Sequence, residues 1–157
     1  MTGQLLSAHT KAMTTLCTAT ATSTAPPTAF FARWEDMDTW PEWDTAVAWT
    51  RLDGPFAVGT TGELKPRGGP KVRFRIETLE PGSEFTDVST MPGATLRIRH
   101  LVAVDDEGLT RVDIEVSLDG PLAWLWGRLL GRGIARSTPE GLAHLVVLAE
   151  ADTAVGR

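Results

Sequence analysis

The chain contains no tyrosine and only one cysteine, Cys17, among its 157 residues. A single cysteine excludes an internal disulfide and is typical of proteins from reducing compartments. No apolar run approaches the roughly 18 residues needed to span a bilayer, and the first residues lack the charged and apolar segments of a signal peptide. We therefore expect a cytoplasmic protein with no stable membrane insertion.

Positive charge and recognised catalytic motifs are also scarce. The chain has 15 lysines and arginines against 20 acids, and its net charge is −5. Since phosphate binding needs clustered lysines and arginines, nucleic acid is not an expected partner. There is no GxSxG, P-loop, HExxH or paired-cysteine motif, and Asp36 and Asp38 lack the glycine and terminal glutamate of a calcium loop. We expect no cofactor and no metal.

The rest of the composition is that of a globular domain. Hydrophobic residues make up 42% and charged residues 22% of the chain, which is ordinary for folded proteins. A chain of this length usually forms one domain. We expect a single domain over residues 1–157, with an ordered core over about residues 11–151 and short tails, acting as a monomer or a homodimer.

The first third of the chain predicts a strand, two short helices and a second strand. Residues 13–22 are rich in β-branched threonine and predict the first strand, which Ala25-Pro26-Pro27 ends. From Thr28 the sequence is helical in character, and Pro41 marks a second helical turn. Residues 44–52 predict the next strand.

The middle of the chain predicts an antiparallel meander. Turn signals recur at residues 67–70, 81–82, 92–93 and 106–108, and apolar and polar residues alternate between them. These turns fix the predicted cross-strand pairs, which include Phe85–His100, Asp87–Ile98, Ser89–Leu96, His100–Ile114, Ile76–Asp87 and Gly62–Phe74. All the pairings give the same result, an apolar face and a face where opposite charges meet, such as Glu63 with Arg73 and Arg99 with Glu115.

The last third of the chain is helical in its spacing. Apolar residues recur every three or four positions, at Leu122, Leu125, Trp126, Leu129 and Leu130, and again at Leu142, Leu145, Val146 and Ala149. Gly131, Gly133 and Pro139 lie between the two groups. They indicate either a kink or two consecutive helices.

Three polar residues interrupt the predicted apolar face: Asp87, Ser89 and His100. In the predicted register Asp87 lies diagonally from His100, at roughly 7–8 Å between Cα atoms. A buried carboxylate without a partner is costly, so Asp87 must be paired, protonated or hydrated. The structural interpretation is that Asp87 and His100 form a satisfied pair within the core, or that Asp87 lies at a wet strand edge. The functional interpretation is that the pair faces a ligand or substrate in a wet cavity.

The tryptophans also allow two interpretations. Four of the six fall between residues 34 and 49, and the other two are Trp124 and Trp126. Trp buries a large area and keeps one hydrogen-bond donor for a wet boundary. They either pack helices onto the sheet, or Trp40, Trp43, Trp49 and Trp126 line or gate a pocket.

Several short motifs resemble one protein family. They are Ala25-Pro26-Pro27, Trp40-Pro41-Glu42-Trp43-Asp44, Gly59-Thr60-Thr61-Gly62, Pro92-Gly93-Ala94 with His100, Thr110-Arg111-Val112 and Gly120-Pro121-Leu122. With this order of elements, the chain resembles the START-like (SRPBCC) superfamily, in its polyketide cyclase/dehydrase and lipid-transport branch, over roughly residues 11–151. The resemblance implies an α+β helix-grip fold. In that fold a curved antiparallel sheet of about seven strands wraps around a long C-terminal helix, with two short helices after the first strand.

The resemblance also implies a hydrophobic small-molecule partner, because such families bind lipids, polyketides or sterols. The leading hypothesis is that the protein binds a lipid or polyketide-like ligand in a cavity between sheet and helix. Asp87, Ser89 and His100 would orient the polar end of the ligand. The expected lining residues are Trp40, Trp43, Trp49, Phe74, Ile76, Phe85, Ser89, Leu96, Ile98, Ile114, Trp126 and Leu129.

Two alternatives belong to other classes. The first is a polyketide cyclase or dehydratase, in which His100 is the catalytic acid/base and Asp87 tunes its pKa. The better-understood cyclases use a tyrosine hydroxyl, which this chain lacks. In the second, a membrane-surface or protein-interaction module, residues 124–126 and Arg128, Arg132 and Arg136 form an interfacial helix. Against it, the sheet needs the apolar residues of that helix as its cover.

Overall fold

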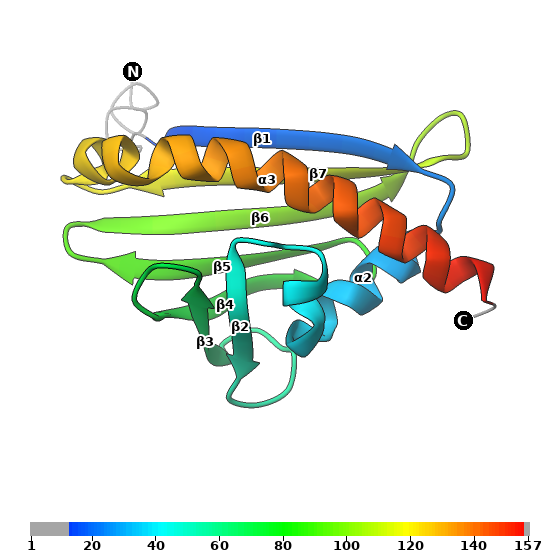
Figure 1. The fold of residues 1–157 in the computed structure, drawn as a ribbon, viewed down its shortest axis with the longest axis horizontal. Helices are drawn as coiled ribbons and strands as arrows, with labels where there is room; N and C mark the ends of the chain where they lie inside the picture. The colour runs from blue at the N-terminus through cyan, green and yellow to red at the C-terminus, as the bar shows by residue number, and fades with distance from the viewer. Residues whose placement is uncertain (1–12, 156–157) are drawn as a thin grey trace, which may run out of the picture.

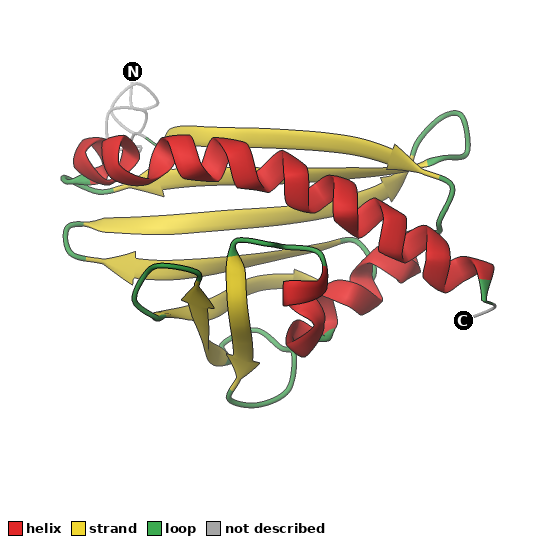
Figure 2. Ribbon diagram, in the orientation of Figure 1, coloured by secondary structure: helices red, strands yellow, loops and turns green. Residues whose placement is uncertain are grey.

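The computed structural model describes residues 13–155, which form one antiparallel sheet with helices packed on its concave side (Figures 1 and 2). The elements in chain order are β1 (Thr14–Ser23), α2 (Pro27–Glu35), the 3-10 helix η1 (Met37–Glu42), β2 (Val47–Leu52), β3 (Thr61–Pro66), β4 (Val72–Glu80), β5 (Glu84–Met91), β6 (Ala94–Val104), β7 (Thr110–Asp119) and α3 (Ala123–Ala154). The strand order is β1-β7-β6-β5-β4-β3-β2. In Figure 1, α3 runs along β1 and β7, and α2 meets its C-terminal half. The predicted helix-grip fold is confirmed.

The cross-strand pairs of the sheet confirm the predicted register. Phe85–His100, Asp87–Ile98, Ser89–Leu96, His100–Ile114, Ile76–Asp87 and Gly62–Phe74 are cross-strand partners. The loop between β4 and β5 is one residue longer than predicted, because Glu80 faces Glu84. A β-bulge between Ile76 and Thr78 absorbs the extra residue, so the inner face keeps its phase.

The two faces of the sheet separate as the pattern predicts. The inner face is apolar, and side chains such as Phe74, Ile76 and Phe85 are buried there. On the outer face, Arg73 Nη1 lies 3.7 Å from Glu63 Oε2 and Arg99 Nη1 lies 3.4 Å from Glu115 Oε2. Burial of one face alone therefore fixes the register of the whole meander.

The short helix α2 carries an aromatic face. Pro27 occupies its first turn, where a missing N–H breaks no helical hydrogen bond. Trp34 follows Phe30 by four residues and Phe31 by three, so the three side chains share one side of the helix. All three are buried. The helix is thus held to the sheet by aromatic packing.

The strand β2 begins later than the sequence predicts. The expected start was residue 44, but the side chain of Asp44 accepts a hydrogen bond of 3.0 Å from the backbone N–H of Ala46. This local turn replaces extended structure, and the strand starts at Val47.

The C-terminal helix α3 is continuous through Gly131, Gly133 and Pro139, so the alternative of two consecutive helices is wrong. Its buried residues are Ala123, Gly141, Leu142, Leu145 and Ala149. Between residues 124 and 140 no side chain is fully buried. The first half of α3 therefore covers the sheet much less tightly than the second half.

The end of α3 is anchored and extends past the predicted limit at about residue 151, to Ala154. Arg33 donates from Nε and Nη2 to the carboxylate of Asp152, at 2.7 and 2.9 Å. Ser23 Oγ donates to Glu150 at 2.7 Å. These contacts tie the last turns to α2 and β1, so the second half of α3 closes its end of the sheet.

Candidate functional site

Three polar side chains, those of Asp87, Ser89 and His100, lie on the inner face of the sheet. Asp87 and Ser89 occupy alternate positions of β5, and His100 lies on the neighbouring strand β6, so all three project to the same side. Their exposed fractions are 6%, 7% and 4%. Polar groups this deeply buried normally have hydrogen-bond partners.

The imidazole of His100 is held between aromatic rings. It lies flat on Phe85, with ring centroids 3.9 Å apart and planes 6° from parallel. The centroids of Trp34 and Trp40 lie 5.3 and 6.1 Å away. Nδ1 lies 3.3 Å from the carbonyl oxygen of Phe85, which favours the tautomer with its proton on Nδ1.

Asp87 has an oxygen with no hydrogen-bond partner in the described chain. Its Oδ2 is fully buried and lies 4.0 Å from Nδ1 of His100. That separation exceeds the roughly 2.7–3.2 Å of a hydrogen bond. The structure therefore brings the predicted pair together without joining it by a hydrogen bond.

Burial moves both groups towards their neutral forms. Loss of hydration raises the pKa of the Asp87 carboxyl to about 7, against the effect of its own backbone N–H. Loss of hydration also lowers the pKa of His100 to about 3, although the carbonyls of Phe85 and Ile98 favour the charged ring. At neutral pH the imidazole is uncharged, so the 4.0 Å contact is not an ion pair. The sequence favoured His100 as the group that titrates near neutrality, but in the structure that group is Asp87.

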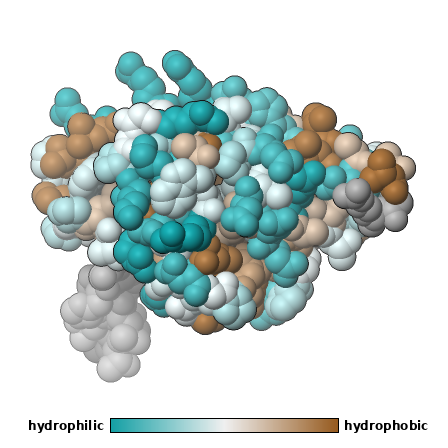
Figure 3. All heavy atoms as spheres, turned by 60° about the horizontal axis from the view of Figure 1, so that its bottom comes forward, coloured by the Kyte–Doolittle hydropathy of each residue, from teal (hydrophilic) through white to brown (hydrophobic). Residues whose placement is uncertain are grey.

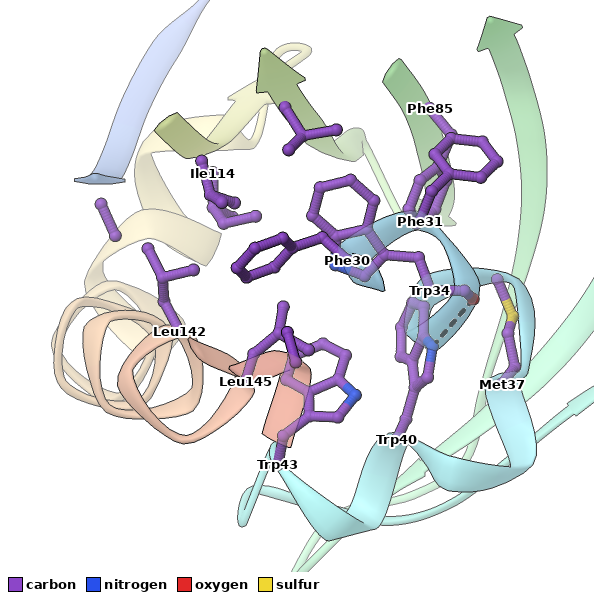
Figure 4. Close-up of a cluster of buried hydrophobic side chains, with 14 of the residues drawn as sticks. Phe30, Phe31, Trp34, Met37, Trp40, Trp43, Phe85, Ile114, Leu142 and Leu145 are labelled. Atoms are coloured by element: carbon purple, nitrogen blue, oxygen red, sulfur yellow. Dashed lines mark hydrogen bonds between the residues drawn. The ribbon is translucent and has the colours of Figure 1, made fainter. Parts of the chain in front are cut away.

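An aromatic cluster packs against His100 at one end of the site, and Figure 4 shows many of its side chains. It consists of Phe30, Phe31, Trp34, Trp40, Trp43, Phe56 and Phe85. Trp40 Nε1 donates a hydrogen bond of 3.0 Å to the backbone oxygen of Trp34, drawn as a dashed line in Figure 4. The Nε1 atoms of Trp34 and Trp43 are buried and have no partner in the described chain. Two indole donors are thus available to water or to a ligand.

Sequence reasoning missed Trp34 as a site residue. Its side chain is fully buried, and its ring contacts those of Phe85 and His100. The signal was present, because Trp34 follows Phe30 by four residues and Phe31 by three. Helical spacing places these three side chains on one face, which had to be buried.

Most of the predicted lining residues lie in or against the main core. Trp40, Trp43, Phe74, Ile76, Phe85 and Ile114 are buried there, and Leu96 and Ile98 pack against it while partly exposed. Trp126 packs against a second, smaller cluster around Leu118. Its Nε1 donates a hydrogen bond of 2.8 Å to the backbone oxygen of Pro92, so this indole joins α3 to the turn between β5 and β6.

Trp49 and Leu129 lie at the surface, with exposed fractions of 40% and 66%. A β-bulge between Val47 and Trp49 leaves Val47 and Thr50 as the buried residues of β2, which turns Trp49 outwards. Leu129 lies on the exposed side of α3. The structure therefore does not place either residue in the interior.

The end of the site opposite the aromatic cluster is less tightly closed. Along β5 and β6 the pairs run from Phe85–His100 through Asp87–Ile98 to Ser89–Leu96. Leu96 and Ile98 are only partly buried, and residues 124–140 of the adjacent part of α3 contribute no buried side chain. The polar corner, formed by Asp87, Ser89 and His100, thus lies between the aromatic cluster and an apolar region that is partly covered.

Two surface hollows lie away from this corner. One, of about 560 Å³, is lined by residues of α2 and η1 and by Asp152. The other, of about 220 Å³, lies beside residues 35–38 and the end of β2. Neither is lined by Asp87, Ser89 or His100.

Within residues 13–155 no group of three or more histidine, cysteine or acidic side chains is arranged to hold a metal ion. In the same range, no helix combines the length and the apolar character needed to cross a membrane.

The family of the chain follows from comparison with known proteins. The family model described as polyketide cyclase / dehydrase and lipid transport matches residues 14–150. The chain belongs to this family. The resemblance seen in the sequence motifs is thereby confirmed, and comparison with curated proteins found no match.

Solved structures show how widely the fold of this family member is shared. The ZhuI aromatase/cyclase from Streptomyces sp. R1128 superposes with a TM-score of 0.74 at 14% identity, over 92% of this chain and 99% of that one. Ara h 8.0201 gives a TM-score of 0.68 at 13% identity, over 89% and 99%. The di-domain aromatase/cyclase StfQ of the steffimycin pathway gives 0.70 at 12% identity, over 90% of this chain and 52% of that one. The TM-scores establish a common fold. At identities of 12–14% the likeness concerns the fold alone.

Proposed function

We propose that the protein binds a small hydrophobic or aromatic molecule, lipid-like or polyketide-like, between the sheet and α3. The polar end of the ligand contacts Asp87, Ser89 and His100. The observation that carries this proposal is the buried Oδ2 of Asp87, which has no hydrogen-bond partner in the described chain. An unpaired buried polar atom is destabilising, and a ligand hydroxyl or carbonyl would satisfy it.

The arrangement along the strands gives the ligand an orientation. Its apolar body contacts Leu96 and Ile98, which are partly exposed, and the neighbouring half of α3. Its polar end reaches Asp87, and the aromatic cluster forms the inner wall. Family membership supports an apolar ligand.

The charges of the corner favour uncharged ligands. A neutral imidazole and a half-protonated carboxyl can donate hydrogen bonds to hydroxyl and ketone oxygens and accept hydrogen bonds from hydroxyl groups. A ligand carboxylate would meet the partial negative charge of Asp87 in a site of low dielectric constant. A neutral hydroxyketone should therefore bind more tightly than an anion with the same ring system.

Calorimetric titration with a hydroxyacetonaphthone and with naphthoate tests this at neutral pH. We expect the hydroxyketone to bind at least tenfold more tightly, and Asp87→Asn to weaken its binding by roughly tenfold. Asp106→Asn, in the exposed turn between β6 and β7, is the matched control and should have no effect. Equal binding of the two ligands, no binding, or full binding by Asp87→Asn would refute the proposal.

A second candidate function is proton transfer, as in a polyketide cyclase or dehydratase. It is favoured by one observation, the carboxyl of Asp87 with a pKa of about 7 beside a neutral imidazole, because a group poised near the working pH is an effective acid or base. In this scheme the Asp87 carboxylate removes a proton from the carbon next to a ligand carbonyl, which leaves an enolate, and the resulting carboxylic acid returns a proton to that carbon. The ring of His100 positions the ligand.

Exchange of the methylene protons of a β-diketone in deuterated water, followed by proton NMR, tests the catalytic version. We expect exchange faster than in buffer, rising with pH around 7, and lost in Asp87→Asn. A rate that equals the buffer rate, or that ignores Asp87→Asn, leaves the protein as a binder only.

A further inference from the structure

The first half of α3 carries exposed apolar side chains on a helix that was expected to cover the sheet with them. Trp124 is 62% and Leu129 66% exposed, and Leu125 is also exposed. Figure 3 shows hydrophobic surface gathered at the end of the molecule where α3 begins. Large apolar side chains exposed close together usually mark an interaction surface.

Three arginines lie among these side chains. Arg128, Arg132 and Arg136 are exposed and form no ion pair within residues 13–155, whereas sheet arginines such as Arg97 bind carboxylates, in this case Glu77 at 2.9 Å. No acidic residue precedes Glu140 on α3. The patch is therefore basic, although the whole chain carries a net charge of −5.

Helical geometry places these side chains on one face. With 3.6 residues per turn, Leu125, Leu129, Arg132 and Arg136 fall within an arc of about 60°, with Trp124 and Arg128 beside them. We call these six residues the α3 outer face. The helix start is fixed by a hydrogen bond of 2.8 Å from the backbone N–H of Leu122 to the oxygen of Gly93, so the face is presented by a rigid support.

We propose that the α3 outer face docks the protein reversibly on the surface of an anionic phospholipid bilayer. Trp124, Leu125 and Leu129 enter the boundary between headgroups and acyl chains, where indole is favoured. The arginines reach the lipid phosphates with their extended side chains. This explains why apolar and cationic residues alternate along one exposed helix face.

A second copy of the chain fits this surface less well. A two-fold contact through the α3 outer face would bring the same arginines of both copies together, without acids to balance them. An anionic bilayer offers negative charge and apolar depth at once, which matches both halves of the residue pattern. The proposal does not depend on any ligand in the interior.

Co-sedimentation of the full chain with phosphatidylcholine vesicles, with and without about 30 mol% phosphatidylserine, tests the proposal. We expect pelleting only with the anionic vesicles, and its loss at high salt. Trp124→Ala should weaken binding roughly tenfold, and each Arg→Gln change at 128, 132 and 136 roughly fivefold. Thermal unfolding should be unchanged, because all these side chains are exposed.

Two control variants sharpen the test. Val147→Ala removes an apolar side chain that is 65% exposed on the same helix, about 30 Å further along, and Arg67→Gln removes an exposed arginine from a turn. Both should bind as the wild type does. Absence of pelleting, pelleting insensitive to Trp124 and the arginines, or equal losses in the controls would overturn the proposal. So would a dimer in solution that depends on Leu129 without any vesicle binding.

Discussion

The imidazole of His100 lies parallel to the phenyl ring of Phe85, 3.9 Å away between centroids. The two residues are cross-strand partners on β6 and β5, so the stack is built into the register of the sheet. A ring held this way is deprived of water, and burial lowers the pKa of His100 to about 3. The site therefore presents a neutral, oriented imidazole.

The lowered pKa of His100 has a measurable consequence. Between about pH 3 and 6.5 the unfolded chain binds a proton at this residue and the folded chain does not. The contribution of His100 to stability is thus lost as the pH falls through this window. Relative to the wild type, His100→Gln should gain a few kcal/mol in free energy of unfolding between about pH 6.5 and pH 4. Urea unfolding at both pH values measures this, and a difference that does not change with pH would contradict it.

The raised pKa of Asp87 works in the opposite direction. The folded chain keeps this proton up to about pH 7, whereas the unfolded chain releases it near pH 4, so stability falls as the pH rises between these values. Asp87→Asn removes this loss. The free energy of unfolding of the variant, minus that of the wild type, should increase by a few kcal/mol from about pH 4.5 to pH 8. An unchanged or decreasing difference would show that the carboxyl is hydrated in the folded protein.

Trp34 should be the most sensitive of the tryptophans to truncation. It is fully buried at the centre of the aromatic cluster, so Trp34→Ala leaves a large cavity and should lower the free energy of unfolding by roughly 3–5 kcal/mol. Trp124→Ala, at an exposed position, should change it by less than about 0.5 kcal/mol. Chemical denaturation of both variants makes the comparison, and similar losses would contradict the complete burial of Trp34.

Gly120, between β7 and α3, cannot accept a side chain. Its φ of +114° lies in the region that favours glycine, and a Cβ would lie 2.6 Å from the oxygen of Gly93. We expect Gly120→Ala to destabilise the protein by roughly 2–3 kcal/mol. Gly133→Ala, within α3 and with open space around it, should instead stabilise the protein by up to about 1 kcal/mol. Thermal unfolding separates them, and a shared direction of change would contradict this assignment.

The strand register was predictable because independent turns imposed the same phase. Each Gly- or Pro-containing turn placed the apolar residues of its two strands on one side, and burial of that side excludes a slip by one residue. The approach of Asp87 to His100 followed from this register alone. Even the unpredicted bulge beside Ile76 compensated for a longer turn, which kept Ile76 opposite Asp87.

The features that sequence reasoning missed depend on tertiary contacts. The outward turn of Trp49 results from a bulge that no local motif announces. The protonation of Asp87 and His100 depends on how completely the aromatic cluster excludes water, which strand alternation does not specify. The exposure of Leu129 arises because the first half of α3 lies along the edge of the sheet formed by β1 and β7 (Figure 1), so the helix does not use every apolar residue as cover.

The central claim is that the corner formed by Asp87, Ser89 and His100 contacts a bound ligand. The most direct test is an NMR titration that follows the imidazole nitrogen signals of the protein while a neutral aromatic hydroxyketone is added. We predict saturable shifts of the His100 signals that are much larger than those of His144 on α3, whose Nδ1 lies 3.2 Å from the backbone oxygen of Trp43. Unchanged His100 signals at saturating ligand, or equal shifts at both histidines, would contradict the claim.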